Sequence, residues 1–261
     1  MRPALLLALF ATGCPSNLEA QTHVSKLRVL AIKAEPPELI LQADAGLPST
    51  TVTALVADPS GDPISMQFAL CEDLSGVPSP TLPCPGSAGL DLPEAGPLSA
   101  RLDLADPRIL ELASSTPFDG GSIAAALDQG VPLLIGFTAS AGVETFSGFS
   151  TLTLRTAARG PPAANPRLVD LEIPDAGPGE TVTLQPIYDE DPARRYLFSF
   201  FATDGSLAWL HSTNRTSTGQ TAPTSVDWTA PKVSGSTVHF WVVVREGSGG
   251  ADWLERDATV R

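Results

Sequence analysis

The sequence of 261 residues is short of positive charge. It holds 16 Lys and Arg against 29 Asp and Glu, which gives a formal net charge of −13. Such a chain repels phosphate backbones and anionic lipid surfaces, so we expect no nucleic-acid partner. Charged residues of all kinds make up only 17% of the chain and hydrophobic residues 43%, a balance that argues against wholesale disorder.

Sequence motifs of catalysis and cofactor binding are also missing. The chain contains no GxSxG, HExxH, GxGxxG or P-loop pattern, and its three cysteines form no CxxC or Cys/His cluster of a zinc site. We therefore expect neither an enzyme nor a cofactor. The alternative is a secreted hydrolase built on His211, which lies in "LHSTNRTS" beside Ser212 and near Asp204. Nothing in that pattern fixes the geometry that a base and a nucleophile need. We expect His23 and His239 to be incidental.

The chain begins with a short apolar run, Ala4 to Ala11, after the single positive charge of Arg2. Eight helical residues reach about 12 Å, against roughly 30 Å of hydrocarbon in a bilayer, so this run cannot span a membrane. It is followed by the small residues Thr12 and Gly13 and then by Cys14. This order is typical of a signal peptide that directs export rather than of a folded element.

The stretch "ATGC" resembles the lipobox of bacterial lipoproteins, although Ala11 stands where that family most often has Leu. The resemblance implies removal of residues 1–13 and acyl chains such as palmitate on Cys14, followed by a tether over residues 14–23. More than one chain is needed for stable anchoring. An ordinary secretory signal cut elsewhere is the alternative. Pro15 occupies the position that carries sorting information, which leaves inner and outer membrane open; the outer membrane is the expected location.

Proline (25) and glycine (22) are abundant, and short Val/Thr/Leu/Phe runs lie between them, which is typical of an all-β protein. One pattern occurs twice. "TVTALVAD" (51–58) and "ISMQFAL" (64–70) have counterparts in "TVTLQPIYD" (181–189) and "RYLFSFFAT" (195–203). Each half ends in a predicted hairpin, over 132–155 and over 238–261.

About seven short strands in each half predict two tandem immunoglobulin-like β-sandwich domains. We expect domain 1 over residues 24–156, a Pro-rich semi-rigid linker over 157–165, and domain 2 over 166–261. "VDWTAP" (226–231) and "FWVVVREGSGG" (240–250) resemble parts of bacterial Ig-like or PKD-like modules. Taken whole, the chain resembles the tandem Ig-like lipoproteins of Gram-negative bacteria, whose motifs are structural rather than catalytic.

Domain 1 carries a long insertion after Cys71 that domain 2 lacks. An exported protein with Cys71 and Cys84 as its remaining pair favours a disulfide between them, with two buried free thiols as the alternative. Six prolines over residues 72–98 favour an extended loop over a further strand. The loop holds apolar side chains that either fold back onto the sheet or face a partner: Leu74, Leu82, Leu90, Leu92 and Leu98. "SIAAALDQG" (122–130) predicts a short helix.

Two further groups of residues allow a binding interpretation. Asp189, Glu190 and Asp191 are weak candidates for calcium ligands, but the nearby Arg194 and Arg195 explain them equally as a charge-compensated turn. All four tryptophans lie in domain 2: Trp209, Trp228, Trp241 and Trp253. On strands they are more often core residues than a ligand platform, although an exposed one could stack on a glycan.

The sequence is therefore interpreted as a non-catalytic envelope lipoprotein that binds or scaffolds an envelope protein or a glycan. A calcium-dependent adhesion module is an alternative. Fold alone says little here, because β-sandwiches host many activities.

The lipobox resemblance predicts that Cys14→Ser releases the protein from membranes while both domains stay folded, because the anchor lies outside them. Fractionation of cells into soluble and membrane pools measures this, with Ser16→Ala as the neighbouring control that keeps the anchor. A Cys14→Ser variant that still partitions wholly into detergent would show that Cys14 is not the site of the lipid anchor.

Overall fold

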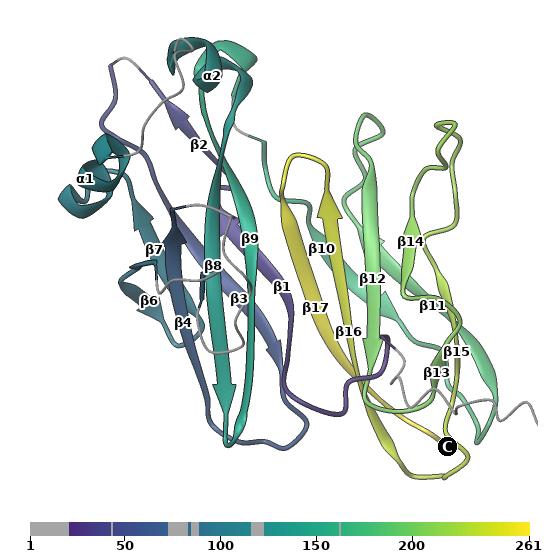
Figure 1. Ribbon diagram of the computed structural model, residues 1–261. Helices are drawn as coiled ribbons and strands as arrows, with labels where there is room; N and C mark the ends of the chain where they lie inside the picture. The colour runs from purple at the N-terminus through teal and green to yellow at the C-terminus, as the bar shows by residue number, and fades with distance from the viewer. Residues whose placement is uncertain (1–20, 43, 73–82, 85–88, 116–122, 162) are drawn as a thin grey trace, which may run out of the picture.

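The computed structural model describes residues 21–42, 44–72, 83–84, 89–115, 123–161 and 163–261. They form two β-sandwiches side by side, each with two sheets whose strand pairs are antiparallel apart from one parallel pair in the first sandwich (Figure 1). The strands of the first sandwich are β1 (Arg28–Glu35), β2 (Glu38–Leu41), β3 (Ser49–Ala57), β4 (Ile64–Cys71), β5 (Leu90–Asp91), β6 (Glu94–Gly96), β7 (Ser99–Asp103), β8 (Val131–Ala141) and β9 (Glu144–Thr156).

The strands of the second sandwich are β10 (Leu168–Glu172), β11 (Thr181–Tyr188), β12 (Tyr196–Ala202), β13 (Ser206–Leu207), β14 (His211–Thr213), β15 (Val226–Thr229), β16 (Thr237–Glu246) and β17 (Ala251–Thr259). Both sandwiches are rich in the β-branched and aromatic residues that favour strands. The two hairpins that close the halves, β8–β9 and β16–β17, are formed as the sequence predicts.

The strand order of domain 1 is immunoglobulin-like. One sheet runs β1-β3-β7-β6 and the other β2-β9-β8-β4-β5. In the letters used for immunoglobulin domains these are an A-B-E-D sheet and a C-F-G sheet extended at both edges. The chain leaves the first sheet at Pro36–Pro37, and β2 then pairs in parallel with β9 of the second. Leu39, Leu102 and Ile135 lie at the centre of the core between them.

Domain 2 has a similar order, with sheets β10-β11-β15-β13 and β14-β12-β16-β17. It differs in that its second sheet has four strands rather than five, and its edge strand β13 precedes β14, whereas β5 precedes β6 in domain 1. Its core is more aromatic than that of domain 1. Trp228 is 1% exposed and packs edge-on against Phe240, with ring centroids 4.9 Å apart. The all-β fold of two tandem immunoglobulin-like sandwiches is therefore confirmed.

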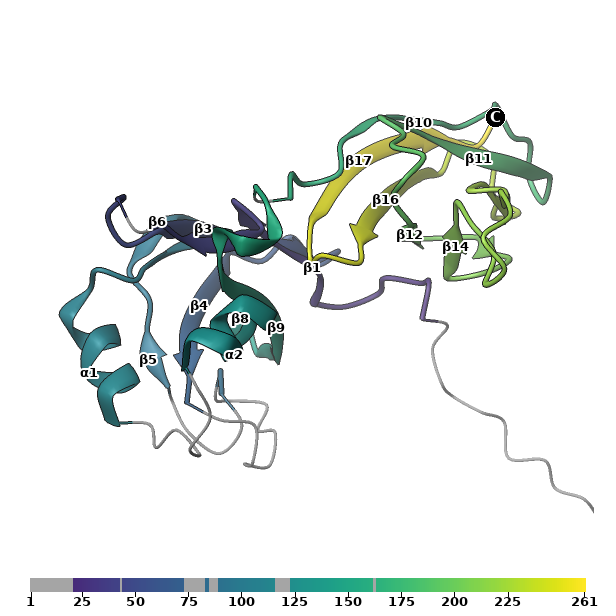
Figure 2. The same cartoon turned by 90° about the horizontal axis from the view of Figure 1, so that it is seen from above.

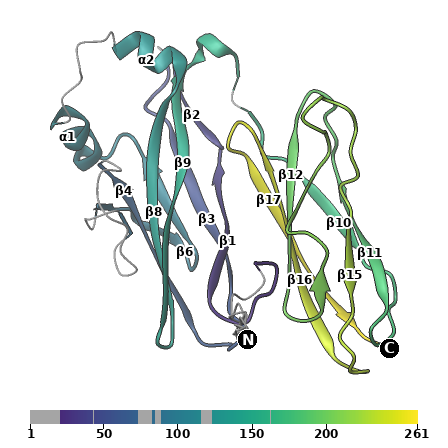
Figure 3. The same cartoon turned by 45° about the vertical axis from the view of Figure 1, so that its right-hand side comes forward.

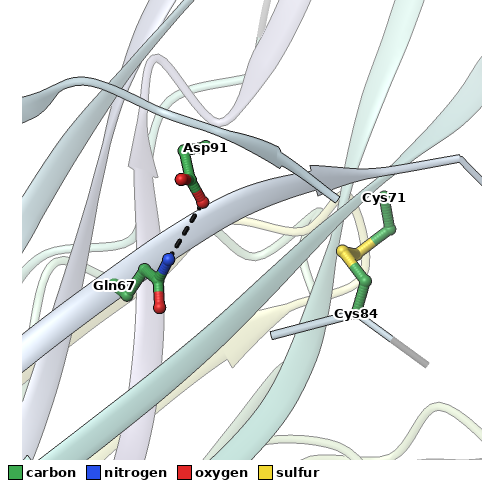
Figure 4. The surroundings of a disulfide bond; sticks show 4 residues. All are labelled: Gln67, Cys71, Cys84 and Asp91. Carbon is green, nitrogen blue, oxygen red and sulfur yellow. Dashed lines mark hydrogen bonds between the residues drawn. A yellow bond between two sulfur atoms is a disulfide. The ribbon is translucent and has the colours of Figure 1, made fainter. Parts of the chain in front are cut away.

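The insertion of domain 1 begins with a disulfide between Cys71 and Cys84, as the sequence predicts. The bond joins the end of β4 to the segment before β5 on the same sheet, so it does not bridge the two layers. Figure 4 shows it beside the hydrogen bond from Gln67 on β4 to Asp91 on β5, 2.9 Å long. Gly136 on β8 permits this arrangement, because a Cβ there would collide with the carbonyl of Pro83.

The expectation of a loop without a further strand over 72–98 is wrong for residues 90–91 and 94–96, which form β5 and β6. The physical reason is burial: Leu92 enters the domain 1 core and Leu90 packs against it, so this part of the insertion folds back onto the sheet. Leu98 is half-buried, while Leu74 and Leu82 lie outside the described residues.

Two helices connect β7 to β8. The predicted helix is α2 (Ile123–Gln129), which ends at Gly130 with a φ of 93°. The other helix, α1 (Pro107–Ser115), was not predicted, although its start has a clear signal in the sequence. Asp106 precedes it and accepts a hydrogen bond from the Arg108 backbone N–H, as an N-cap residue does, and Pro107 is its first residue.

A third hydrophobic core joins the two domains. It contains Leu30, Ala31 and Leu55 of domain 1 and Phe201, Trp241 and Val243 of domain 2, every one of them at most 7% exposed. The β1 edge of domain 1 thus packs on the outer face of the β12-β16-β17 sheet, as seen from above in Figure 2. Burying these side chains stabilises the joined arrangement in the way that a domain core does.

Polar contacts fix the direction of this packing. Leu30 lies at a β-bulge and has no partner in the β1–β3 register, which frees its carbonyl. That carbonyl accepts a 2.6 Å hydrogen bond from the largely buried guanidinium of Arg245 on β16. Lys33 of β1 forms a 3.2 Å ion pair with Asp252 of β17 and lies over the ring of Trp253.

The segment that precedes β1 is attached to domain 2. Ala202 at the end of β12 donates its backbone N–H to the Thr22 carbonyl and accepts from the Val24 N–H, both at 2.9 Å. Val24 is 1% exposed within the interdomain core. The described chain therefore starts at the lower end of the junction between the domains (Figure 3).

We predict that Trp241→Ala lowers the free energy of unfolding by about 3–5 kcal/mol and separates the thermal unfolding of the two domains into two transitions. The reason is that Trp241 belongs to the core that both domains share. Calorimetry measures both effects. Trp228→Ala is the matched control, because it removes a tryptophan from the core of domain 2 alone and should leave the contacts between the domains in place. A single unchanged transition in the Trp241→Ala variant would contradict a coupled interface.

Candidate binding surfaces

A polar groove of about 790 Å³ lies at the upper end of the junction between the domains. Its walls come from β9, from the linker after it, and from the turn between β16 and β17. These segments lie at the top of Figure 1, whereas Thr22 and Val24 pair with Ala202 at the opposite end of the β12–β16 ladder. The groove is thus at the far end of the junction from the N-terminal segment.

The floor of the groove is a buried ion pair. Arg155 of β9 donates to both carboxylate oxygens of Glu38 on β2, at 3.2 and 2.9 Å, and both side chains are at most 10% exposed. The other guanidinium hydrogens go to the carbonyls of Thr156, Gly160 and Pro161. The ion pair thereby ties the linker to domain 1.

The pKa of Glu38 is set by opposing effects. Burial by itself raises it, but the hydrogen bonds from Arg155 and from the Ala163 N–H, with the charge of Arg155, outweigh burial and lower it. The Glu38 carboxylate therefore stays ionised at pH values below the ordinary pKa of a glutamate.

The rim of the groove presents unused polar groups. Arg159 is exposed and forms no ion pair with any residue that the structure describes. The hydroxyl of Ser248, in the β16–β17 turn, is buried and has no hydrogen-bond partner among those residues. Arg194 already pairs with Asp191 at 3.2 Å and donates to the Ala164 carbonyl. In the described part of the rim, the Arg159 guanidinium is therefore open to a ligand, whereas the Ser248 hydroxyl is unpartnered but covered.

A second, shallow groove of about 360 Å³ lies at the β14 edge of domain 2. Its lining residues are Trp209, His211, Ser212, Pro223, Ser225 and Asp227. The strand order places this edge across the sheet from β17. Trp209 is 63% exposed, so a large aromatic surface is open to solvent there.

His211 does not meet the other members of the imagined triad. Its Nδ1 is 3.0 Å from the Ser199 hydroxyl, which also accepts from Arg245 at 3.2 Å. Burial lowers the pKa of His211, as does the charge of Arg245, and these outweigh a hydrogen bond to the Phe198 carbonyl.

The hydroxyl of Ser212 donates to the Thr224 carbonyl instead of His211. The Asp204 carboxylate accepts from the Gly205 N–H, and its own carbonyl accepts from the Trp228 indole. Successive side chains of a strand point to opposite sides, so His211 and Ser212 diverge along β14 although they are neighbours in the sequence.

The acidic candidates for calcium lie in the turn before β12. Arg167 pairs with Asp189 at 3.4 Å, and Asp191 pairs with Arg194 and caps the Ala193 N–H. Glu190 lies between them. Within the described parts of the chain, no group of three or more His, Cys, Asp or Glu side chains could hold a metal ion. The turn is thus held by arginines.

The remaining predicted residues are placed as follows. Trp228 and Trp241 are core residues and Trp253 is half-buried beside Lys33. His239 contacts more than its incidental role implied: its ring lies between Asp257 and Glu255 on β17 and packs on Trp241. In the β16–β17 hairpin His239 lies directly opposite Asp257. Aligning the two arms of the predicted hairpin would therefore have shown this contact in the sequence. The carbonyl of His23 accepts from Arg28.

Cys14 lies outside the described residues. No helix among those that are described is long and apolar enough to cross a bilayer.

We predict that Glu38→Gln lowers the free energy of unfolding at neutral pH by about 3 kcal/mol, because it leaves the buried Arg155 without its counter-ion. The wild-type contribution is present above the ordinary pKa of Glu38 and is lost as the pH falls through the lowered pKa of the folded state. Denaturant titrations at several pH values measure both. Asp189→Asn is the control: it removes the carboxylate of an exposed pair with Arg167 and should change stability far less. Equal losses in the two variants would contradict the account.

Comparison with known proteins finds no matching family model and no curated relative. Solved structures that align with the chain include the Yersinia pseudotuberculosis adhesin InvE, with 11% identity over 88% of this chain and 58% of that one, at a TM-score of 0.26. The tandem Ig repeats of Dlar align with 15% identity over 82% of this chain and 89% of that one, at a TM-score of 0.26. The Bacteroides ovatus SGBP-B, solved with a mixed-linkage heptasaccharide, aligns with 10% identity over 92% of this chain and 48% of that one, at a TM-score of 0.23. The chain thus spans 58% of the adhesin structure, and none of these similarities speaks to its ligand or activity.

Proposed function

We propose that this protein is a lipid-anchored module of the bacterial envelope, attached to the outer membrane through Cys14, that binds or scaffolds an envelope protein or glycan without catalysing a reaction. The observation that carries this proposal is the shared core between the domains. It joins two sandwiches into one body and leaves an open polar groove at the end of the junction far from the N-terminus. Binding residues are commonly held on such rigid scaffolds.

The position of the N-terminal segment supports the anchored arrangement. Residues 14–21 reach at most about 25 Å when extended, so an anchor at Cys14 would hold the lower end of both domains close to the bilayer. Thr22 and Val24 pair with Ala202 at that end. The groove beside Arg159 would then face away from the membrane, toward partners in the periplasm.

The non-catalytic part of the proposal is supported by the contacts of the candidate nucleophile and base. His211 and Ser212 each bond to another group, and Asp204 bonds within its own turn. A hydrolase needs these side chains to converge on one substrate atom. A calcium-dependent module is less supported, because Asp189 and Asp191 have arginine partners.

Photo-crosslinking in intact cells tests the proposal. A photoreactive amino acid in place of Arg159 should crosslink the full-length, anchored protein to one envelope molecule, because the side chain lies on the rim of the groove. The same amino acid in place of Val233, which is 66% exposed on domain 2 and does not line the groove, is the matched control.

A discrete product at position 159 that is absent at position 233 supports a partner in the groove. Equal, diffuse labelling at both positions, or none at position 159, would contradict it.

A further inference from the structure

We propose that the groove at the β14 edge of domain 2 binds a neutral oligosaccharide, with Trp209 as its stacking platform. This inference rests on the proposed function as a binding module and adds the class of ligand and the site. It is independent of the groove between the domains, which is lined mainly by the β16–β17 turn, the linker and domain 1 and shares no lining residue with this one.

The exposure of Trp209 is the first argument. The other tryptophans contribute to packing, with Trp228 at 1% and Trp241 at 6% exposed, whereas Trp209 is 63% exposed. Leaving an indole in water forgoes the free energy that its burial would provide. Trp209 stands between β13 and β14, where the chain crosses from one sheet to the other, so its backbone is held on both sides by strand pairs.

The polar groups beside Trp209 are the second argument, because they are fixed before any ligand arrives. Asp227 accepts a 2.7 Å hydrogen bond from Thr183 through one carboxylate oxygen, and its second oxygen is available as an acceptor. His211 is held by Ser199, which is held in turn by Arg245. Its lowered pKa keeps the imidazole neutral at pH 7. Such preorganised side chains lose little entropy on binding.

An aromatic face flanked by fixed hydrogen-bonding groups suits a pyranose ring. The C–H bonds on one face of a sugar are weakly positive and match the negative face of an indole, while its hydroxyls bond to groups at the edge. A buried protein hot spot would need a deeper, drier pocket than this shallow groove. The lining of the groove offers hydroxyl, imidazole and carboxylate groups instead.

Charge selects a neutral sugar. Among the described residues that line the groove, Asp227 is the one acidic side chain and none is lysine or arginine, and the whole chain carries a net charge of −13. Both features repel uronic acids, sulfated glycans and phosphates. Because the groove is shallow, we infer that it accepts internal sugars of a chain rather than one enclosed chain end.

The test uses the soluble Cys14→Ser protein with both domains and a panel of neutral hexasaccharides: cellohexaose, xylohexaose, mannohexaose, maltohexaose and chitohexaose. Each is titrated while the four indole N–H signals are followed by NMR. At least one sugar should shift the Trp209 signal most and protect its fluorescence from acrylamide quenching. Trp209→Ala should weaken that binding by at least about tenfold with little change in melting temperature, because the side chain is exposed.

Phe149→Ala is the matched control, since it removes an aromatic side chain that is 52% exposed on domain 1 and should leave binding unchanged. Asp227→Asn should weaken binding without abolishing it, and a uronic acid hexamer should bind less well than the neutral sugars.

No binding by any neutral hexasaccharide, or binding that survives Trp209→Ala, would overturn the inference. So would a protein crosslinked at position 209. If the sugars fail while position 159 still crosslinks a partner, the glycan inference falls and the proposed function stands. If the sugars bind while position 159 captures nothing, the partner in the interdomain groove is refuted and the glycan site remains.

Discussion

The hydrophobic core shared by the two domains is the constraint on which the rest of the molecule depends. Trp241 and Val243 extend from a strand that also forms the inner core of domain 2, so the two cores lie on opposite faces of one sheet. Leu30 and Leu55 complete it from domain 1. Without this contact the linker alone would fix the angle between the two domains only weakly. Val24 of the N-terminal segment would also lose the core in which it is buried. A surface built from both domains has a fixed shape only because this core exists.

The buried ion pair follows from the same arrangement. Arg155 and Glu38 face the end of the junction, where the chain leaves domain 1, and the guanidinium collects the carbonyls of the linker residues that follow. Asn165 continues this connection by bonding to the Ala34 carbonyl and to the Ala251 N–H, one in each domain. The groove is therefore a consequence of how the linker is held, and its rim residues, Arg159 and Ser248, lie on segments that the linker contacts have already ordered.

The sequence predicted what depends on local pattern. Alternating apolar residues and turn residues predicted the hairpins and the duplication, and a capped apolar run predicted the short helix α2. The expectation of export to an oxidising compartment predicted the disulfide between Cys71 and Cys84. The sequence missed what depends on distant contacts. Nothing near Trp241 in sequence distinguishes it from Trp228, although one belongs to the interface and the other to an inner core. The partners of His211 and His239 come from other strands, and the role of Leu92 required knowledge of the sheet onto which it folds.

The central claim is that the two domains form one rigid body. Residual dipolar couplings of backbone amides, measured on the Cys14→Ser protein in a dilute aligning medium, test it most directly because each domain reports its own alignment. The account predicts that couplings from residues 28–156 and from residues 168–259 fit a single alignment tensor with the interdomain orientation of Figure 1. Two tensors of different magnitude would mean that the domains move independently, and that result would contradict the account.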